Sequence, residues 1–256
     1  MAYQAQGGKE GSVDVAGKRV VVTGAAGGLG GAIARDLAEA GALVFGLDLA
    51  AGWGRGRLPG VTAVEVDLAS EDSVEVAFAA LAAEPLDALV VAAGIQLHGQ
   101  DGPVTRVPPE VWDRTLAVNL TGTYLTLRCA LPRMVTAGRS SVVLVGSPTG
   151  LTMSGAGYAA YAASKAGMMA LARVVAADYA GSGVRANVVV PGTMRTPLIE
   201  PLLTDPATRR ALIDGLPVGR LGEPEDLTAI TRWLVSDAST FATGGFFAVD
   251  GGLTAR

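Results

Sequence analysis

The chain has 256 residues, of which half are apolar and 17% are charged, and its formal net charge is −4. This length suits one α/β domain with a large core. The small negative charge excludes the nucleic-acid-binding class. No apolar stretch approaches the ~18–20 residues that span a bilayer, which excludes the membrane-spanning class. One cysteine (Cys129) and one histidine (His98) exclude a disulfide framework and a multi-histidine metal site, so we expect a cytoplasmic protein without a metal.

The predicted elements alternate between strands and helices along the chain. Residues 1–16 are rich in glycine and polar side chains and are expected to form a flexible N-terminal tail. Short apolar runs predict strands at 19–23, 42–47, 61–66, 89–93, 141–145, 185–190 and 246–249. Apolar residues at helical spacing predict helices at 29–40, 70–81, 109–135, 158–179 and 224–234.

The strand pattern predicts the fold class. The strands are near-continuous apolar runs, which indicates burial on both faces and hence a parallel sheet between two layers of helices. No change of composition divides the chain after residue 16. We therefore predict one Rossmann-like, doubly wound α/β domain over residues 17–256.

A glycine-rich turn joins the first predicted strand to the first predicted helix. The turn is Thr23-Gly24-Ala25-Ala26-Gly27-Gly28-Leu29-Gly30. Glycines let a pyrophosphate approach the backbone, while the helix N-terminus offers N–H groups and a positive dipole. Many tight turns contain glycine, but here an acid, Asp48, also ends the following strand, and this context indicates a dinucleotide site.

Asp48 indicates which dinucleotide would bind. A carboxylate at this position can accept hydrogen bonds from the adenosine ribose and would repel a 2′-phosphate, so it favours NAD over NADP. Leu49 follows where a basic residue could pair with such a phosphate. The alternative is an ordinary solvated turn residue. Asp67, after the third strand, is expected either to hydrogen-bond the adenine edge or to cap the next helix.

Tyr161 and Lys165 are four residues apart in a predicted helix, so their side chains share one face. Small residues surround them and leave that face open to a ligand. An ammonium group about 4 Å from a phenol at an effective dielectric of about 20 is worth about 4 kcal/mol. Such a charge would bring the phenol pKa from about 10 towards neutrality, where a general acid/base works best.

Two further polar residues are candidates for the same site. Ser147 follows the fifth predicted strand, at the sheet edge where parallel sheets bind their ligands. Asn119 is an uncharged polar residue in an apolar helix. It is either a core amide with satisfied hydrogen bonds or part of a proton relay through a helix kink or a water.

Together these segments resemble the short-chain dehydrogenase/reductase family, from about Gly17 to Gly252. The matching segments are the Thr23-Gly24-x-x-x-Gly28-x-Gly30 turn, Asp48, Asp67-Leu68, Asn119, Ser147, Tyr161, Lys165, Pro191-Gly192-Thr193-Met194-Arg195-Thr196, Arg220 to Asp226, and Val249-Asp250-Gly251-Gly252. The many matches in the family's order make this resemblance specific. It implies an NAD-binding catalytic domain over 17–256, with a substrate loop at about 194–216.

The resemblance also implies individual roles. Tyr161 would exchange a proton with the substrate oxygen, and Ser147 would hydrogen-bond that oxygen. Lys165 would lower the phenol pKa and hold the nicotinamide ribose, while Asn119 would hold a water that links Lys165 to solvent. The implied cofactor-binding residues are Thr23, Gly24, Gly28, Leu29, Gly30, Asp48, Asp67, Leu68, Ala93, Gly94, Tyr161, Lys165, Pro191, Gly192, Met194 and Thr196. A homotetramer built partly from the helices at 109–135 and 158–179 is implied as well.

The chain departs from the family's pattern in two places. Val91-Ala92-Ala93-Gly94 stands where the family usually has Asn-Asn-Ala-Gly, so only the Ala93–Gly94 backbone is carried over as a cofactor contact. The interval from Ser147 to Tyr161 is one residue longer than usual. Thr149 is the one rival hydroxyl, and Ser147 is retained as the catalytic serine.

The expected walls of the substrate pocket are residues 96–98, 149–158 and 194–216, which are mostly apolar. Such a pocket favours an uncharged, moderately hydrophobic secondary alcohol or ketone. The favoured function is therefore an NAD(H)-dependent oxidoreductase. Two alternatives stay open: a sugar-nucleotide epimerase-type enzyme, which usually has a longer C-terminal substrate domain, and a non-catalytic nucleotide-binding protein of the same fold.

Overall fold

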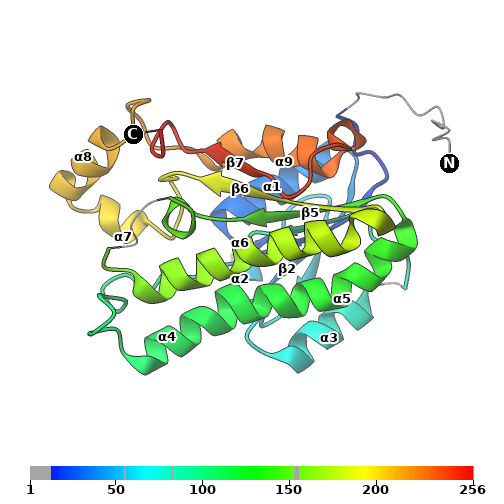
Figure 1. Ribbon diagram of the computed structural model, residues 1–256, viewed down its shortest axis with the longest axis horizontal. Coiled ribbons are helices and arrows are strands. Elements are labelled where there is room, and N and C mark those ends of the chain that lie inside the picture. The colour runs from blue at the N-terminus through cyan, green and yellow to red at the C-terminus, as the bar shows by residue number, and fades with distance from the viewer. Residues whose placement is uncertain (1–12, 55, 82, 153–155, 256) are drawn as a thin grey trace.

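The computed structural model describes residues 13–54, 56–81, 83–152 and 156–255, and its centre is a parallel sheet (Figure 1). The seven strands lie in the order β3-β2-β1-β4-β5-β6-β7. Their bounds are Arg19–Thr23 (β1), Leu43–Asp48 (β2), Val61–Glu65 (β3), Ala88–Val91 (β4), Ser140–Val145 (β5), Val184–Pro191 (β6) and Phe246–Val249 (β7). This arrangement confirms the predicted Rossmann-like, doubly wound α/β fold.

The strand order reverses between β1 and β4, and this reversal places the site. From β1 the chain moves outward through β2 to β3, then returns to the other side of β1 with β4. Connections that leave a parallel sheet in opposite directions open a crevice at the carboxyl ends of the two strands, where ligands bind. Gly24 and Ala92, which directly follow β1 and β4, therefore face a ligand-binding crevice.

Helices cover both faces of the sheet (Figure 1). The helices are α1 (Gly28–Glu39), α2 (Ala50–Trp53), α3 (Glu71–Ala80), α4 (Pro109–Leu116), α5 (Gly122–Ala137), α6 (Ala159–Tyr179), α7 (Glu200–Leu203), α8 (Pro206–Asp214) and α9 (Thr228–Val235). Buried side chains of α1 and α9 pack on one face, and those of α3, α5 and α6 pack on the other. No helix in the described part of the chain has the length and hydrophobicity that crossing a membrane requires.

The segment at 194–216, predicted as a loop, contains two helices, α7 and α8, which lie together at one end of the molecule (Figure 1). The Asp205 side chain caps α8 by accepting a hydrogen bond of 2.9 Å from the Thr208 amide, and proline follows at the first helical position. Both are standard signals of a helix start. The segment predicted as the substrate loop therefore includes two short helices.

The predicted boundary of the N-terminal tail at residue 16 was also wrong. Val15 is 1% exposed and packs in the same core cluster as α1. The adjacent backbone is fixed because the Gly17 amide donates to the Gly41 carbonyl at 2.9 Å. Residues 1–12 of the predicted tail lie outside the described residues.

We predict that Val15→Ala destabilises the protein, whereas Val13→Ala does not. Val15 is buried, so removing its two methyl groups loses about 1.5 kcal/mol of transfer free energy and leaves a cavity. Val13, two residues earlier, is 44% exposed, and its variant should change the unfolding free energy by less than about 0.5 kcal/mol. Denaturant unfolding at equal protein concentrations measures both effects. Equal effects of the two substitutions would contradict the assignment of Val15 to the core.

Candidate active site

Two adjoining cavities lie at the carboxyl ends of the strands. The first cavity, of about 410 Å³, is lined by the glycine-rich turn and by residues that end or follow β2, β3 and β4. The second cavity, of about 360 Å³, is lined by residues that follow β5 and β6 and by α6. The two share the residues Leu29, Ala92, Gly94, Thr196 and Leu198. A ligand longer than either cavity can therefore lie across both.

The glycine-rich turn fits a dinucleotide because side chains are excluded from it. Gly24 has φ +70°, and a Cβ there would lie 2.8 Å from the Ala93 backbone. A Cβ on Gly28 would lie 2.9 Å from the Thr196 side chain, and one on Gly30 would collide with the Gly24 carbonyl. The turn thus keeps bare backbone N–H groups at the start of α1, the arrangement that binds a pyrophosphate.

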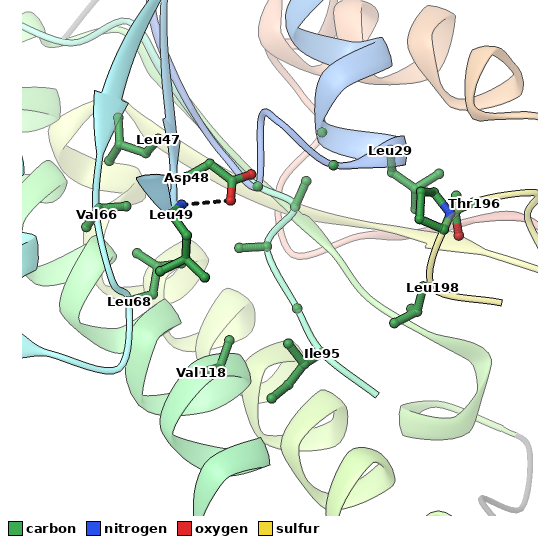
Figure 2. Close-up of a pocket in the computed structure, with 18 of the residues that line it drawn as sticks. Leu29, Leu47, Asp48, Leu49, Val66, Leu68, Ile95, Val118, Thr196 and Leu198 are labelled. Carbon is green, nitrogen blue, oxygen red and sulfur yellow. Dashed lines mark hydrogen bonds between the residues drawn. The ribbon is translucent and has the colours of Figure 1, made fainter. Parts of the chain in front are cut away.

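Asp48 lies at one end of the first cavity and is held in place by backbone hydrogen bonds. Its Oδ2 accepts a bond of 2.8 Å from the Ala26 amide in the glycine-rich turn, and its Oδ1 accepts one of 2.8 Å from the Leu49 amide. Figure 2 shows Asp48 at one end of the cavity and Leu29, Thr196 and Leu198 at the other. The carboxylate is therefore positioned to meet the end of a ligand that is bound along the turn.

The structure brings most, but not all, of the predicted cofactor residues to a cavity wall. Those that line a cavity are Gly24, Gly28, Leu29, Gly30, Asp48, Asp67, Leu68, Ala93, Gly94, Tyr161, Lys165, Pro191, Gly192, Met194 and Thr196. Thr23 lines neither cavity: it is fully buried, and its hydroxyl accepts a hydrogen bond of 3.3 Å from the Ala93 amide. Thr23 joins β1 to the segment after β4. The structure therefore indicates a structural role for this side chain and not a direct contact with a ligand.

Asp67 contributes to the loop before α3, whereas Ser70 caps that helix. The Ser70 hydroxyl accepts from the Ser73 amide at 3.3 Å, and the Asp67 Oδ1 accepts from the Ala69 amide at 2.9 Å. The capping alternative for Asp67 is therefore wrong, because Ser70, three residues later, caps α3. The Asp67 side chain lines the first cavity, where an adenine edge remains its predicted partner.

Asn119 is completely buried in a π-helical turn, Ala117–Thr121, between α4 and α5. Its Oδ1 accepts from the Ile95 amide at 2.8 Å, and its Nδ2 donates to the Ile95 carbonyl at 2.9 Å and to the Ser164 hydroxyl at 3.0 Å. The side-chain amide thus fastens the segment after β4 to α6. Asn119 itself lines neither cavity, and a relay role would have to use its backbone.

Tyr161, Ser147 and Thr149 bring three hydroxyl groups together in the second cavity. Tyr161 and Ser147 share a hydrogen bond, and the Ser147 and Thr149 oxygens are 2.9 Å apart. Thr149, the rival hydroxyl, is a hydrogen-bond partner of Ser147 and lines the same cavity. A Thr149 hydroxyl that donates to Ser147 leaves the serine proton free for a substrate oxygen.

Lys165 is 4% exposed, and its ammonium donates a hydrogen bond of 2.9 Å to the Val145 carbonyl at the end of β5. The Nζ atom is 5.8 Å from the centroid of the Tyr161 ring. Burial lowers the pKa of Lys165 from 10.5 to about 8. The lysine is therefore a group that can lose its proton near the pH at which enzymes work.

The expected lowering of the tyrosine pKa by Lys165 is contradicted for the protein alone. Burial raises the pKa of the Tyr161 phenol above its ordinary value, and the hydrogen bond with Ser147 acts in the opposite direction. The physical reason is that a phenolate at this position loses its hydration, while the ammonium bonds to the Val145 carbonyl.

The walls of the second cavity agree in part with the expected substrate pocket. Gln96, His98, Thr149, Tyr158, Leu198, Ile199 and Leu202 line it, whereas Leu97, Leu151 and Leu203 do not. Met153, also expected there, lies outside the described residues. Leu212 on α8, within the predicted range 194–216, also lines the cavity, whereas the sequence interpretation missed Leu253 near the C-terminal end. Leu253 is held by a turn in which Asp250 accepts from the Gly252 amide at 3.0 Å and the Thr254 amide at 2.9 Å.

The sequence interpretation also missed two residues of the first cavity, Arg114 on α4 and Val118 in the π-helical turn that follows it. The two residues are four positions apart, so helical spacing places them one turn apart on the same face. This spacing was the only sequence signal that could have placed both in one wall. Ile95, next to Val118 in Figure 2, completes this wall.

Comparison with known proteins identifies the family. A family model described as enoyl-(acyl carrier protein) reductase matches residues 24–254. The cis-4-hydroxycyclohexanecarboxylate dehydrogenase of Sinomonas cyclohexanicum is 40% identical over 243 residues, which cover 92% of this chain and 96% of that protein. The chain belongs to the short-chain dehydrogenase/reductase family. The predicted resemblance is thereby confirmed.

Other short-chain dehydrogenases/reductases indicate the general reaction. The D-threitol dehydrogenase of Mycolicibacterium smegmatis is 35% identical and covers 94% of each chain. A gluconate 5-dehydrogenase from Burkholderia cenocepacia, crystallised with NADP and tartrate, superposes with a TM-score of 0.86 at 29% identity, over 95% of this chain and 99% of that one. Because these relatives are dehydrogenases of alcohols or sugars, they support an oxidoreductase that uses a nicotinamide cofactor.

We predict a pH-dependent difference in stability between the wild type and Lys165→Met. Between pH 8 and 10.5 the unfolded chain binds a proton at Lys165 that the folded protein does not, so the stability contributed by this group rises with pH. The wild type should therefore gain up to about 3 kcal/mol relative to the variant across this window. Denaturant unfolding of the cofactor-free proteins at several pH values measures the gain. A difference that stays constant with pH would contradict the burial of a titrating ammonium.

Proposed function

We propose that this protein is an NAD(H)-dependent dehydrogenase that interconverts secondary alcohols and ketones. The observation that carries the proposal is the meeting of Tyr161, Ser147 and Lys165 in a cavity that adjoins the glycine-rich turn. Phenol, hydroxyl and ammonium are the groups that proton exchange with a carbinol oxygen requires. The dehydrogenase activities of the relatives support the same reaction.

The reaction requires that a proton leave the carbinol oxygen as a hydride leaves its carbon. A nicotinamide dinucleotide, when bound, accepts or returns that hydride and in its oxidised form adds a positive charge to the cavity. Tyr161 takes the proton, and Ser147, oriented by Thr149, donates a hydrogen bond to the same oxygen. Lys165 is buried on the same helix face, with its ammonium 5.8 Å from the centroid of the Tyr161 ring, and it would hold the nicotinamide ribose.

Asp48 supports NAD as the cofactor. Its carboxylate is fixed by two amides at the end of the first cavity, where a ribose 2′-phosphate would meet a negative charge. One structural relative was crystallised with NADP. The preference for NAD that we propose for this chain therefore depends on Asp48.

The neutral lining of the second cavity supports an uncharged substrate. Apolar side chains from α7, α8 and the C-terminal turn form much of its wall.

We also propose the homotetramer that the resemblance to the family implies. In its support, Tyr124 and Val135 on α5 and Val174 on α6 are large apolar side chains that are 37–52% exposed. Such side chains are typical of helix faces that pack against another copy.

We predict that Tyr161→Phe abolishes turnover but preserves cofactor binding. The substitution removes the oxygen that exchanges the proton and keeps the ring, so kcat should fall about 10²–10⁴-fold. The dissociation constant for NADH should stay within about threefold, because the first cavity is untouched. NADH absorbance with a panel of secondary alcohols and NADH fluorescence titration measure the two quantities. Undiminished turnover would exclude the proposed mechanism.

We predict that Asp48→Ala changes the cofactor preference. Loss of the carboxylate removes the repulsion of a 2′-phosphate and a hydrogen-bond acceptor for the ribose, so the ratio of kcat/KM for NADP to that for NAD should rise at least about tenfold. Steady-state rates with each cofactor at one fixed alcohol concentration provide the ratio. Asp67→Ala is the comparison variant, since its carboxylate lies after a different strand. An unchanged ratio in Asp48→Ala would exclude Asp48 as the selecting group.

A further inference from the structure

The second cavity has two chemically different sides beyond the reacting groups. Leu198, Ile199 and Leu202 form an apolar side near α7. Gln96, His98 and Tyr158 form the other side, which we call the polar wall. A substrate that offered only hydrocarbon around its carbinol would leave the polar wall without partners. The division therefore bears on the kind of substrate that the cavity accepts.

The polar wall contains hydrogen-bonding groups that the protein does not use. No hydrogen bond joins the Gln96 side chain to another of the described residues. The His98 Nδ1 is 3.3 Å from the Tyr158 hydroxyl, and the two rings meet edge to face with centroids 5.6 Å apart. The other ring nitrogen of His98, Nε2, is buried and has no hydrogen-bond partner among the described residues. Buried groups without partners lower stability, so a ligand that supplies one gains affinity.

The polar wall is fastened to the helix that carries the catalytic tyrosine. Asp101, three residues after His98, accepts hydrogen bonds from the Ala160 amide at 3.2 Å and the Tyr161 amide at 3.0 Å. The Gly102 carbonyl accepts from the Ala159 amide at 3.2 Å. The first three amides of α6 are thus capped by the same loop that carries Gln96 and His98. The distance from the polar wall to the Tyr161 oxygen is consequently fixed, as binding of two groups on one substrate requires.

The charges around the cavity define which second group fits. Lys165 is the one charged side chain among the described residues that line it, and its ammonium is already bonded to the Val145 carbonyl. A carboxylate or phosphate on the substrate would have no free cation as a partner in this lining. An amide and a phenol–imidazole pair are instead suited to a neutral hydroxyl or carbonyl oxygen, because each offers both a donor and an acceptor.

We infer that the polar wall is a subsite for a second, neutral oxygen of the substrate, so that the substrate class is diols, polyols and hydroxyketones rather than simple alcohols or hydroxy acids. This inference rests on the proposed dehydrogenase function. Gln96 and Tyr158 bind the second oxygen, the His98 ring holds the Tyr158 hydroxyl, and Asp101 is a positioning residue. The apolar side accepts the carbon skeleton between the two oxygens.

The test compares substrates that differ by one oxygen. Cyclohexanol, the 1,2-, 1,3- and 1,4-cyclohexanediols and 4-hydroxycyclohexanecarboxylate are each assayed with the wild-type protein and NAD or NADP. At least one diol should exceed both cyclohexanol and the hydroxy acid at least tenfold in kcat/KM. Gln96→Leu and Tyr158→Phe should each lower kcat/KM for that diol about tenfold more than they lower it for cyclohexanol. Gln100→Leu is the matched control, because Gln100 is an exposed residue of the same loop that does not line the cavity.

Each outcome has a definite meaning. Cyclohexanol or the hydroxy acid turning over as well as every diol would overturn the inference but keep the proposed function. So would equal losses for diol and cyclohexanol in Gln96→Leu and Tyr158→Phe, since a merely structural role lowers both rates. Absence of turnover with every alcohol and both cofactors would overturn the proposed function itself. A selective loss for the diol, absent in Gln100→Leu, supports the subsite.

Discussion

A buried ammonium group at the carboxyl ends of the central strands is the constraint on which the site depends. Removing a charge from water is unfavourable unless partners replace its hydration, and Lys165 has the Val145 carbonyl as its described partner. The surrounding chain is built close to it. Gly94 leaves room beside the Nζ atom, and Gly150 lets the turn after Ser147 pack directly on the backbone of α6 at Lys165. The fold thus retains an incompletely compensated charge 5.8 Å from the centroid of the Tyr161 ring.

The reversal of strand order places the two cavities side by side, and the side chains of Thr23 and Asn119 fix their relative positions. Thr23 joins β1 to the segment after β4, and Asn119 joins that same segment to α6. The glycine-rich turn after β1 and the helix α6 are therefore connected through the short segment from Ala93 to Ile95. The side chains of Thr23 and Asn119 both lie outside the cavities. Residues that match a family motif can therefore act by positioning other groups.

Much of the fold was predictable because its signals are local. Short apolar runs identified all seven strands, and Ser70 marked the start of α3. Asp48 could be placed at the site because the carboxyl ends of parallel strands share one edge of the sheet. The helix α8 carried an equally local signal in Asp205-Pro206, but the interpretation as a loop passed over it.

The remaining features depend on contacts between distant segments. Nothing near Asp101 in the sequence indicates that it caps a helix that begins at residue 159. Likewise, burial of Val15 depends on the α1 layer, and the raised tyrosine pKa depends on how completely the fold removes water from the phenol. The spacing of Tyr161 and Lys165 gives their common face but not the direction in which the ammonium points. Such properties follow from tertiary packing, which pattern and propensity do not encode.

The turn that holds Leu253 has a consequence for how enzymes of this kind diversify. Asp250 fixes the turn that places Leu253, near the C-terminal end, in the wall of the second cavity. Together with Leu212 on α8, it forms a part of the pocket that is separate in the chain from the catalytic helix and from the glycine-rich turn. Exchange of side chains in these two segments can reshape substrate range while the chemistry and the cofactor crevice stay intact.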